Sequence, residues 1–392
     1  MNVPLFKTVA GNTYPCATIG KDDVQYCIHN CTVEEVKEYV KYLESLGYKK
    51  HAERSIIVGS TLPQKENLFY TFTNEESNIF VWWFCETHIV RVLATSKSNL
   101  PSTIKPRLER VDTSPISITQ TDCNGMGYVV QLADQSFVVI DGGRRNDQDV
   151  EKLYQTLKSK SQKPIISLWI FTHADCDHIE VATDFINRYS KLVEIKAFAY
   201  NFPNLDKVQL IVDKKRDIEN INALEKAIRK NYKNADVYVL RTGQEYHLKG
   251  ATIEILWTAD DTYPNVYVSC NDLTAMFRFK FDNGKTFMVL GDPVHQYSKQ
   301  VAFIYGDYLK SDIMQVAHHG LIGGDKLLYQ YIDADICLWP VKKERFLGTQ
   351  PNQKYQWCLG EGGCDYNSYL RDDNIKKRTH YHSSEQVVLI VK

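Results

Sequence analysis

Four side chains able to bind a metal ion occur within six residues, in the segment His173-Ala174-Asp175-Cys176-Asp177-His178. Imidazole and carboxylate groups are good ligands for zinc, manganese and iron. The apolar run 165–171 precedes them and predicts a buried strand, and a helix is predicted to follow. The segment would therefore be a loop that points several ligands into one space. Helix capping by Asp177 is the alternative, but two histidines and two aspartates at this spacing favour metal binding.

Two later strands are also predicted to end in ligand-type residues. The apolar run 288–290 is followed by Gly291-Asp292, and the run 313–317 by His318-His319-Gly320. Each signal is weak alone, because an aspartate after a strand is usually a turn residue and paired histidines are usually surface groups. Together, three strands would deliver such residues at their carboxyl ends, which is where α/β folds assemble their sites.

The segment 173–178 resembles the HxHxDH signature of metallo-β-lactamase-fold hydrolases, with Asp175 where the second histidine normally stands. The strand 138–140 and the Asp141-Gly142-Gly143 that follows are similar to that family's early strand, which supports the metal loop. His318-His319-Gly320, preceded by 269–273, is similar to the branch that contains the nuclease domain of bacterial DNA-uptake (competence) proteins and the phosphorylcholine esterases. The resemblance covers about 113–392 and implies an αββα sandwich, a dinuclear metal site and hydrolysis.

The resemblance also implies a ligand set for two divalent ions. Two residues of the 173–178 loop would hold each ion, an aspartate would bridge the ions, and one histidine of the 318–319 pair would complete the set. The expected ligands are His173 and Asp175 for one ion, Asp177 and His178 for the other, Asp292 as the bridge, and His318. Zinc is the expected metal. Manganese or iron are alternatives, because Asp175 offers a harder oxygen ligand than an imidazole.

Catalysis is expected to depend on Asp177 and His319. Water bound to the ions would have its pKa lowered to near neutrality, which provides hydroxide at physiological pH. His319 would donate to a substrate oxyanion or protonate the leaving group. His318 is placed as the ligand because it leaves its strand first, and the reverse order of these two histidines stays open.

Several other residues have both a functional and a structural interpretation. Asn271 and Thr274 would either touch the substrate or cap a turn. His247 is the candidate for a histidine that the family often has before the bridging aspartate, but its surroundings predict a turn before a strand. Cys176 is expected to be a small packed thiol that points away from the metals.

The positioning elements divide at a polar, proline-containing stretch, 96–115. Before it, residues 1–110 predict a small α+β module with helix 32–46 and strands 68–72, 79–84 and 88–94. After it, residues 113–392 mix strand meanders with strand–helix alternation, which predicts two sheets with helices outside them, an α/β (α+β) fold. The expected strands there are 116–121, 128–132, 137–141, 165–172, 193–200, 237–240, 252–256, 273–281, 286–290, 313–317, 336–339 and 387–391, and the expected helices are 148–157, 181–189, 206–232, 298–308 and 326–332.

The composition is that of a globular protein with balanced charge. The 392 residues are 43% hydrophobic, and 47 Lys and Arg face 48 Asp and Glu, a net charge of −1. This balance gives no general attraction for nucleic acid or an anionic membrane, without excluding a local basic patch. We expect a cytoplasmic protein, because no export signal or membrane-length apolar run is present and the ten cysteines form no CxxC pair. The oligomeric state is not indicated.

The sequence therefore predicts a metal-dependent hydrolase, with a phosphodiester as the favoured substrate. A small or headgroup-like phosphodiester fits the charge balance better than long DNA. One alternative is an ester, lactone or thioester hydrolase, because a single scaffold can host many chemistries. Another is a non-catalytic binding protein with a decayed metal site. The N-terminal module would recognise substrate, cover the site or mediate dimerisation.

Overall fold

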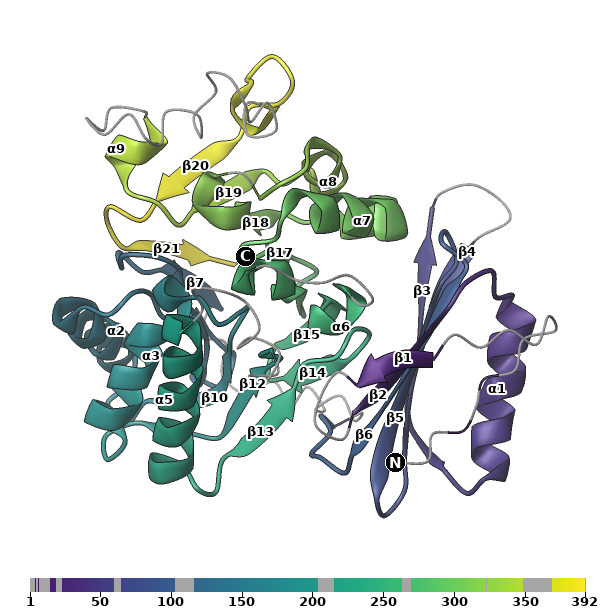
Figure 1. The fold of residues 1–392 in the computed structure, drawn as a ribbon. Helices are drawn as coiled ribbons and strands as arrows, with labels where there is room; N and C mark the ends of the chain where they lie inside the picture. The colour runs from purple at the N-terminus through teal and green to yellow at the C-terminus, as the bar shows by residue number, and fades with distance from the viewer. Residues whose placement is uncertain are drawn as a thin grey trace.

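The computed structural model describes residues 4, 6, 15–18, 23–59, 65–102, 116–203, 215–262, 269–321, 323–347 and 369–391. Within these ranges the strands form three sheets, which we name sheet N, sheet I and sheet II. Sheet N comes from the N-terminal part of the chain, and the two larger sheets come from the remainder (Figure 1). None of the helices in the described ranges has the length and apolar character needed to span a membrane.

Sheet N is antiparallel and has the strand order β1-β2-β6-β5-β4-β3. Helix α1 (Val33–Ser45) covers one face of it, as the amphipathic pattern predicted. The helix begins with a capping box, in which Glu35 N–H donates to the Thr32 hydroxyl and Thr32 N–H donates to the Glu35 carboxylate. The strands are β1 (Pro15–Thr18), β2 (Val24–Ile28), β3 (Lys49–Val58), β4 (Lys65–Thr73), β5 (Ser77–Phe84) and β6 (Ile89–Ser96).

Sheet I has the order β13-β12-β10-β9-β8-β7-β21, with β11 paired to β10. Strands β9, β10, β12 and β13 are parallel, so their carboxyl ends meet at one edge. Its strands are β7 (Ser117–Gln120), β8 (Gly127–Gln131), β9 (Phe137–Asp141), β10 (Ile165–Ile170), β11 (Glu194–Ile195), β12 (Ala197–Tyr200), β13 (Asp236–Val239) and β21 (Val387–Ile390). Helices α2 (Asp147–Lys160), α3 (Cys176–Tyr189) and α5 (Lys215–Asn231) pack on its outer face.

Sheet II has the order β14-β15-β16-β17-β18-β19-β20 and repeats this arrangement, with parallel strands from β17 to β20. Its strands are β14 (Glu245–Leu248), β15 (Ala251–Trp257), β16 (Met276–Phe281), β17 (Thr286–Val289), β18 (Ile313–Gln315), β19 (Ile336–Trp339) and β20 (Thr379–His382). Helices α7 (His295–Tyr305) and α8 (Lys326–Ile332) pack on its outer face. Short helices complete this half: α6 (Ala259–Thr262), η1 (Cys270–Leu273), η2 (Gly306–Leu309), η3 (Ala317–Gly320) and α9 (Lys343–Phe346).

The layers run helix, sheet, sheet, helix, which is the predicted αββα sandwich. Side chains from both large sheets, such as Val138 and Phe277, share one buried core between them. A second core lies between sheet I and its helices, and a third lies outside sheet II. Burial of apolar surface on both faces explains why the inner strands are almost continuous apolar runs.

Several elements differ from the sequence-based expectations. Strands β3 and β14 were not expected as strands: each lies at a sheet edge, β3 carries mostly polar side chains, and β14 has only four residues. Helix α3 begins at Cys176, five residues earlier than the expected 181. The start of the expected strand 273–281 is instead the end of η1, and the described part of the expected helix 206–232 is α5.

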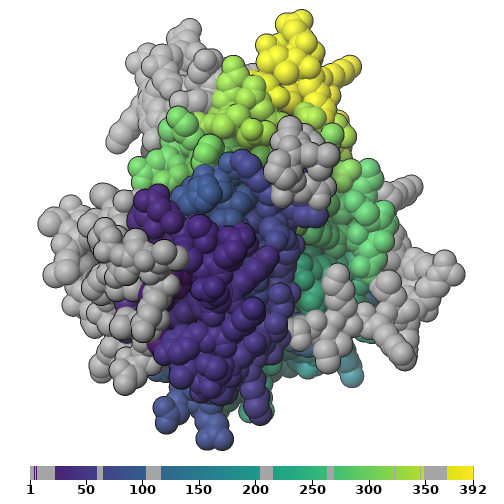
Figure 2. All heavy atoms as spheres, turned by 90° about the vertical axis from the view of Figure 1, so that its right-hand side faces the viewer, coloured from purple at the N-terminus to yellow at the C-terminus, as the bar shows by residue number. Residues whose placement is uncertain are grey.

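Sheet N lies against the outer face of sheet II and its helices, so one core runs through both parts of the chain. Phe84 of β5 packs edge-on against Tyr305 of α7, with ring centroids 6.0 Å apart. Figure 2 views the molecule from the side of sheet N. The purple and blue atoms of the N-terminal part lie directly against the green atoms of α7 and its surroundings. The residues between 103 and 115, where the domain boundary was expected, lie outside the described ranges.

A buried ion cluster also joins the two parts. Glu254 of β15 is fully buried and accepts from Arg54 of β3, from Arg278 Nε at 2.6 Å and from the Tyr308 hydroxyl at 2.6 Å. Lys280 Nζ lies 2.8 Å from the same carboxylate. Burial alone would raise the pKa of Glu254, but Arg54, Arg278 and Lys280 lower the pKa to about 2.

We expect Glu254→Gln to lower the free energy of unfolding by about 3–5 kcal/mol, because three cations would lose their buried counter-charge. The folded pKa lies below the ordinary value of 4.5, so the stabilisation is present above pH 4.5 and is lost as the pH falls towards 2. Urea unfolding at neutral and acid pH measures both effects. Glu245→Gln, which removes a partly exposed partner of Arg54, is the control and should cost about 1 kcal/mol or less. Equal losses in the two variants would contradict this account.

Candidate metal centre

The candidate site lies where the carboxyl ends of β9, β10, β17 and β18 meet. Asp141 ends β9, His173 follows β10, Asp292 follows β17, and His318 and His319 follow β18. The structure thus brings together the ends of strands that are more than a hundred residues apart in sequence. The amino-terminal turn of α3 reaches the same place from the 173–178 loop.

Asp141 and Thr172 orient two of the histidines. The Asp141 carboxylate accepts from Thr172 N–H at 2.8 Å, from the Thr172 hydroxyl at 2.7 Å and from His178 Nδ1 at 2.7 Å. Because the Thr172 proton goes to Asp141, its oxygen must accept from His173 Nδ1, 3.0 Å away. The Nδ1 of each histidine is thus held by a hydrogen bond, which directs Nε2 into the site, as in metal-ligating histidines.

His319 has the same arrangement on the other side of the site. Its Nδ1 lies 2.7 Å from the carbonyl oxygen of Pro340, which can only accept, so this nitrogen must donate. Its Nε2 lies 3.1 Å from Asp292 Oδ2 and 3.4 Å from Asp177 Oδ2. Asp292 Oδ2 is also 3.2 Å from His178 Nε2. Asp292 Oδ2 therefore stands between the Nε2 atoms of His178 and His319.

His318 is placed differently from His319. Its Nε2 lies 4.0 Å from Asp292 and 3.3 Å from the amide nitrogen of Asn271, which belongs to η1. Both histidines have a positive φ, 49° for His318 and 55° for His319, a backbone conformation that turns consecutive side chains in different directions. His319 faces the two aspartates, and His318 faces η1.

The two aspartates of the loop also differ. Asp175 caps α3, since its carboxylate accepts from Cys176 N–H at 2.7 Å. Asp177 has non-helical backbone angles inside the first turn, and its carbonyl accepts from Met126 N–H. Gly125 lies so close that a Cβ would approach this carbonyl oxygen to 2.2 Å, so only glycine fits beside it. Asp175, not Asp177, is therefore the capping residue.

Potential ligand atoms gather into three groups in the described part of the chain. One group is His173, His178 and Asp292; a second is Asp177, His178 and His319; a third is Asp175, Cys176 and Asp177. The second group brings Asp177 and His319 together, the two residues predicted to be catalytic. His318 belongs to none of these groups. It lies beside them, and its Nε2 contacts Asn271.

The residues fit a metal ion by the chemistry of their donor atoms. Imidazole lone pairs and carboxylate oxygens face one another, and His173 Nε2, His319 Nε2 and Asp292 Oδ1 are buried without a hydrogen-bond partner in the described structure. Ligands at about 2.0–2.2 Å from a tetrahedral ion stand about 3.4 Å apart. The three distances of 3.1–3.4 Å between His178, His319, Asp177 and Asp292 are close to that spacing.

The charges of the site lead to the same conclusion. Burial would lower the pKa of His178, but Asp292 and Asp141 raise it well above its usual range. For His319, Asp292 and Asp177 likewise outweigh burial and raise the pKa. Burial and the neighbouring His178 lower the pKa of His173 to about 4. The buried carboxylates thus require positive charge nearby, which a divalent cation can supply.

Asn271 and Thr274, whose role was left open, both belong to the site region. Asn271 Oδ1, Thr274 Oγ1 and His318 Nδ1 are buried and have no hydrogen-bond partner among the described residues. A Cβ at Gly291 would lie 2.6 Å from Thr274, which places this threonine beside Asp292. His247 lies elsewhere, on edge strand β14, where its Nδ1 is 3.3 Å from the Thr252 hydroxyl.

One charged residue at the site was not expected from the sequence. Arg144 follows β9 and donates to Cys176 Sγ at 3.1 Å, and Cys176 Sγ is 4.0 Å from Asp177 Oδ1. The Arg144 side chain is exposed and forms no ion pair with another described residue. The next residue, Arg145, instead pairs with Asp184 at 2.9 Å. Thus Arg144 leaves a cationic group beside the ligand cluster.

Comparison with known proteins gives similarity in structure only. No family model matches the chain, and no curated protein matches it at the significance required. Similar solved structures include the metallo-β-lactamase fold protein YhfI from Bacillus subtilis, with 14% identity over 70% of this chain and 99% of that chain and a TM-score of 0.41. CmlA, a diiron β-hydroxylase from Streptomyces venezuelae, has 9% identity over 93% of this chain and 79% of that chain, with a TM-score of 0.40.

A metallo-β-lactamase variant from Cronobacter sakazakii has 13% identity over 70% of this chain and 94% of that chain, with a TM-score of 0.33. Two of these neighbours are thus described as metallo-β-lactamase or metallo-β-lactamase-fold proteins, and the third as a diiron hydroxylase. At such low identity the likeness concerns the fold, and the chemistry of this chain has to be argued from its own residues.

Proposed function

We propose that the protein is a metal-dependent hydrolase of phosphodiesters that holds two divalent ions, with zinc as the expected metal and manganese or iron as alternatives. The observation that carries this proposal is the group of imidazole Nε2 atoms that face Asp292 and Asp177 inside a buried site. Carboxylates buried in this way need positive charge beside them, which divalent cations between these ligands would supply. The ions would activate water and neutralise the charge that develops on the substrate.

His173, His178 and Asp292 would hold one ion, and Asp177, His178 and His319 surround the position of the other. We therefore assign His319 as the ligand and His318 as the residue that faces the substrate, the reverse of the order favoured by sequence. The position of its Nε2, 3.3 Å from Asn271 and 4.0 Å from Asp292, supports this role, because an imidazole there can exchange a proton with a substrate oxygen. Asp175 would support the loop as a helix cap.

Asp141, Thr172 and Pro340 would act as positioning residues. Each accepts a hydrogen bond from a histidine Nδ1 and so directs that histidine's Nε2 into the site. Sheet N would support η1 from outside: Trp82 donates to Asp261 of α6, and α6 packs against η1. The N-terminal module would thereby hold Asn271 in place.

Arg144 supports an anionic substrate over a neutral ester or lactone. Its guanidinium donates to Cys176 Sγ, and Cys176 Sγ in turn lies close to the Asp177 carboxylate. The guanidinium has no carboxylate partner in the described structure. A guanidinium matches two oxygens of a phosphate group, whereas a lactone offers no such charge. The His318-His319-Gly320 resemblance to phosphodiesterases favours the same class. All seven described cysteines are buried thiols, which is in keeping with a reducing compartment such as the cytoplasm.

Kinetics on matched substrates test this proposal. With bis(p-nitrophenyl) phosphate, we expect Arg144→Ala to raise KM about ten- to a hundredfold, because a charge-assisted hydrogen bond is lost. Arg145→Ala, whose side chain pairs with Asp184, should leave KM unchanged. A neutral aryl lactone should be hydrolysed more slowly and should not respond to Arg144→Ala. Faster lactone hydrolysis would favour the ester or lactone alternative, and metal binding without turnover on either substrate would favour a binding protein.

A further inference from the structure

A basic groove lies at the opposite end of sheet I from the metal centre. It has a volume of about 830 Å³ and is formed by the segments that precede β10, β11 and β13. Strand β10 runs from the groove at Ile165 to Ile170, just before the metal loop. Six residues of strand separate the two sites by about 20 Å. The groove is therefore distinct from the metal centre.

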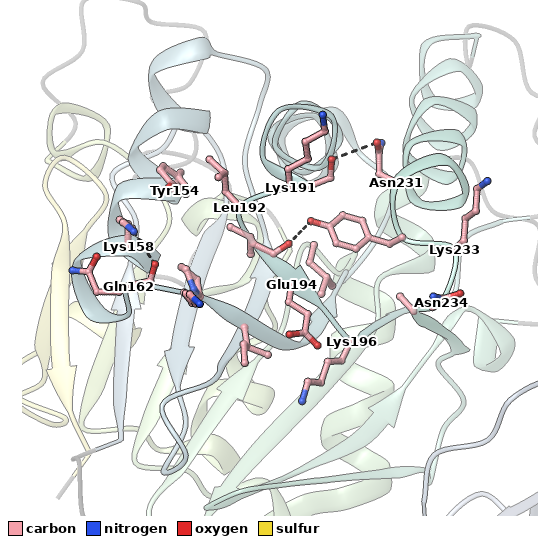
Figure 3. Close-up of a pocket in the computed structure, with 18 residues that line it drawn as sticks. Tyr154, Lys158, Gln162, Lys191, Leu192, Glu194, Lys196, Asn231, Lys233 and Asn234 are labelled. Atoms are coloured by element: carbon pink, nitrogen blue, oxygen red, sulfur yellow. Dashed lines mark hydrogen bonds between the residues drawn. The ribbon is translucent and has the colours of Figure 1, made fainter.

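The groove is strongly positive. Glu194 is the single acidic residue that lines it, against five lysines: Lys158, Lys163, Lys191, Lys196 and Lys233. None of these lysines forms an ion pair with a residue in the described ranges, and Lys158 Nζ donates to the carbonyl of Gln162 at 2.7 Å. Four of them are labelled in Figure 3, spread around the opening on different segments. In a protein of net charge −1, this is a marked local excess.

Helix dipoles account for part of this charge at most. The carboxyl ends of α2, α3 and α5 lie here, and lysines near such ends are stabilised by the partial negative charge. Each helix end contributes about half an elementary charge, so three ends offset about one and a half charges. With Glu194 also counted, about half of the charge of the five lysines is left for a ligand.

Apolar and aromatic surface lies between the lysines. Leu192 is 56% exposed, and it lies with Tyr154 between Lys158 and Lys191 (Figure 3). The Tyr154 ring stacks on Tyr189 with centroids 4.2 Å apart, and the Tyr232 hydroxyl donates to the carbonyl of Val193 at 2.9 Å. These contacts hold the rings of Tyr154 and Tyr232 in place. A rigid apolar surface with cations around it suits a ligand that is both planar and anionic.

We propose that the basic groove binds a nucleotide, with its phosphates among the lysines and its base against Leu192 and Tyr154. The volume lies within the range of about 300–1,000 Å³ that small-ligand sites occupy. The same chemistry is present in a free nucleoside triphosphate and in a single-stranded oligonucleotide. A flat anionic membrane would not reach into a concave site. The proposal does not depend on the metal centre or its reaction.

Calorimetric titration of the full-length protein tests the proposal with three probes: ATP, a short oligothymidylate and inorganic tripolyphosphate. We expect Lys191→Ala/Lys233→Ala to weaken ATP or oligothymidylate binding by about tenfold or more and to reduce its salt dependence. The control is Lys37→Ala/Lys41→Ala, which removes two exposed lysines from α1 and should change the affinity less than twofold. Lys191→Gln/Lys233→Gln provides a second pair with polar side chains, should the alanine variant be unstable.

The probes also separate the possible sources. Preference for ATP would indicate a free nucleotide, and preference for oligothymidylate would indicate a nucleotide chain; either result with the expected effect of the variants supports the proposal. Tripolyphosphate binding as tightly as ATP would overturn the role of the apolar surface. Equal losses in groove and control variants, or unchanged binding in the groove variant, would place the ligand elsewhere and overturn the proposal.

Discussion

Asp292→Ala should lose the metal ions and all measurable hydrolysis, while the fold is retained. Asp292 stands between His178 and His319, and it is the carboxylate shared by both sides of the site. Mutation of a residue that only supports a ligand typically weakens metal binding by about 10- to 100-fold. Removal of the ligand Asp292 itself should therefore weaken metal binding by more than about a hundredfold. Metal titration and phosphodiester hydrolysis, measured with circular dichroism on the same sample, provide the test.

The matched control for this variant is Asp282→Ala, in the exposed turn between β16 and β17 of the same sheet. It should retain its metal and its activity. Retention of metal by Asp292→Ala would contradict the assignment of Asp292 as a ligand. Loss of ellipticity in the same variant would show that Asp292 is needed for folding, and Asp292→Asn, which keeps the shape of the side chain, would then decide the matter.

The second large effect is expected to separate two adjacent histidines. His319→Ala should lower metal affinity by more than about a hundredfold, because its Nε2 faces both Asp177 and Asp292. His318→Ala should keep the metal content and lower kcat, because its Nε2 lies at the edge of the site, 4.0 Å from Asp292, where it would contact the substrate. Metal content and kcat, measured side by side on both variants, distinguish the roles.

Each residue serves as the control for the other, because the two side chains are identical and adjacent. The opposite result, with metal lost from His318→Ala and kept by His319→Ala, would restore the order that the sequence favoured. Equal loss of metal from both variants would mean that both histidines are ligands, and the proposed contact of His318 with the substrate would be wrong.

The ligand cluster could be predicted because its signals are local. Each candidate follows an apolar run, and parallel strands bring their carboxyl ends together, so 173–178, Asp292 and 318–319 were expected at one edge before the fold was known. The helices and inner strands could be predicted for the same reason, since a buried face requires apolar residues at regular intervals along the sequence.

The remaining features depend on contacts with no local signal. The carbonyl of Pro340 ensures that Nδ1 of His319 carries a proton. Every residue has a backbone carbonyl, so the sequence does not indicate this contact. The separation of His318 from His319 depends on two positive φ angles that no residue type required. The edge strand β3 was missed because an exposed edge tolerates polar residues on both faces, which removes the alternation that marks a strand, and β14 was missed because its alternation covers only four residues.

Metal content per chain tests the central claim most directly. The protein should be purified without chelators or added metal, and its zinc, manganese and iron should be measured by elemental mass spectrometry. We expect about two divalent ions per chain, one beside His173 and Asp292 and the other beside Asp177 and His319. A protein that contains no such ion, and binds none when zinc, manganese or iron is added back, would contradict it.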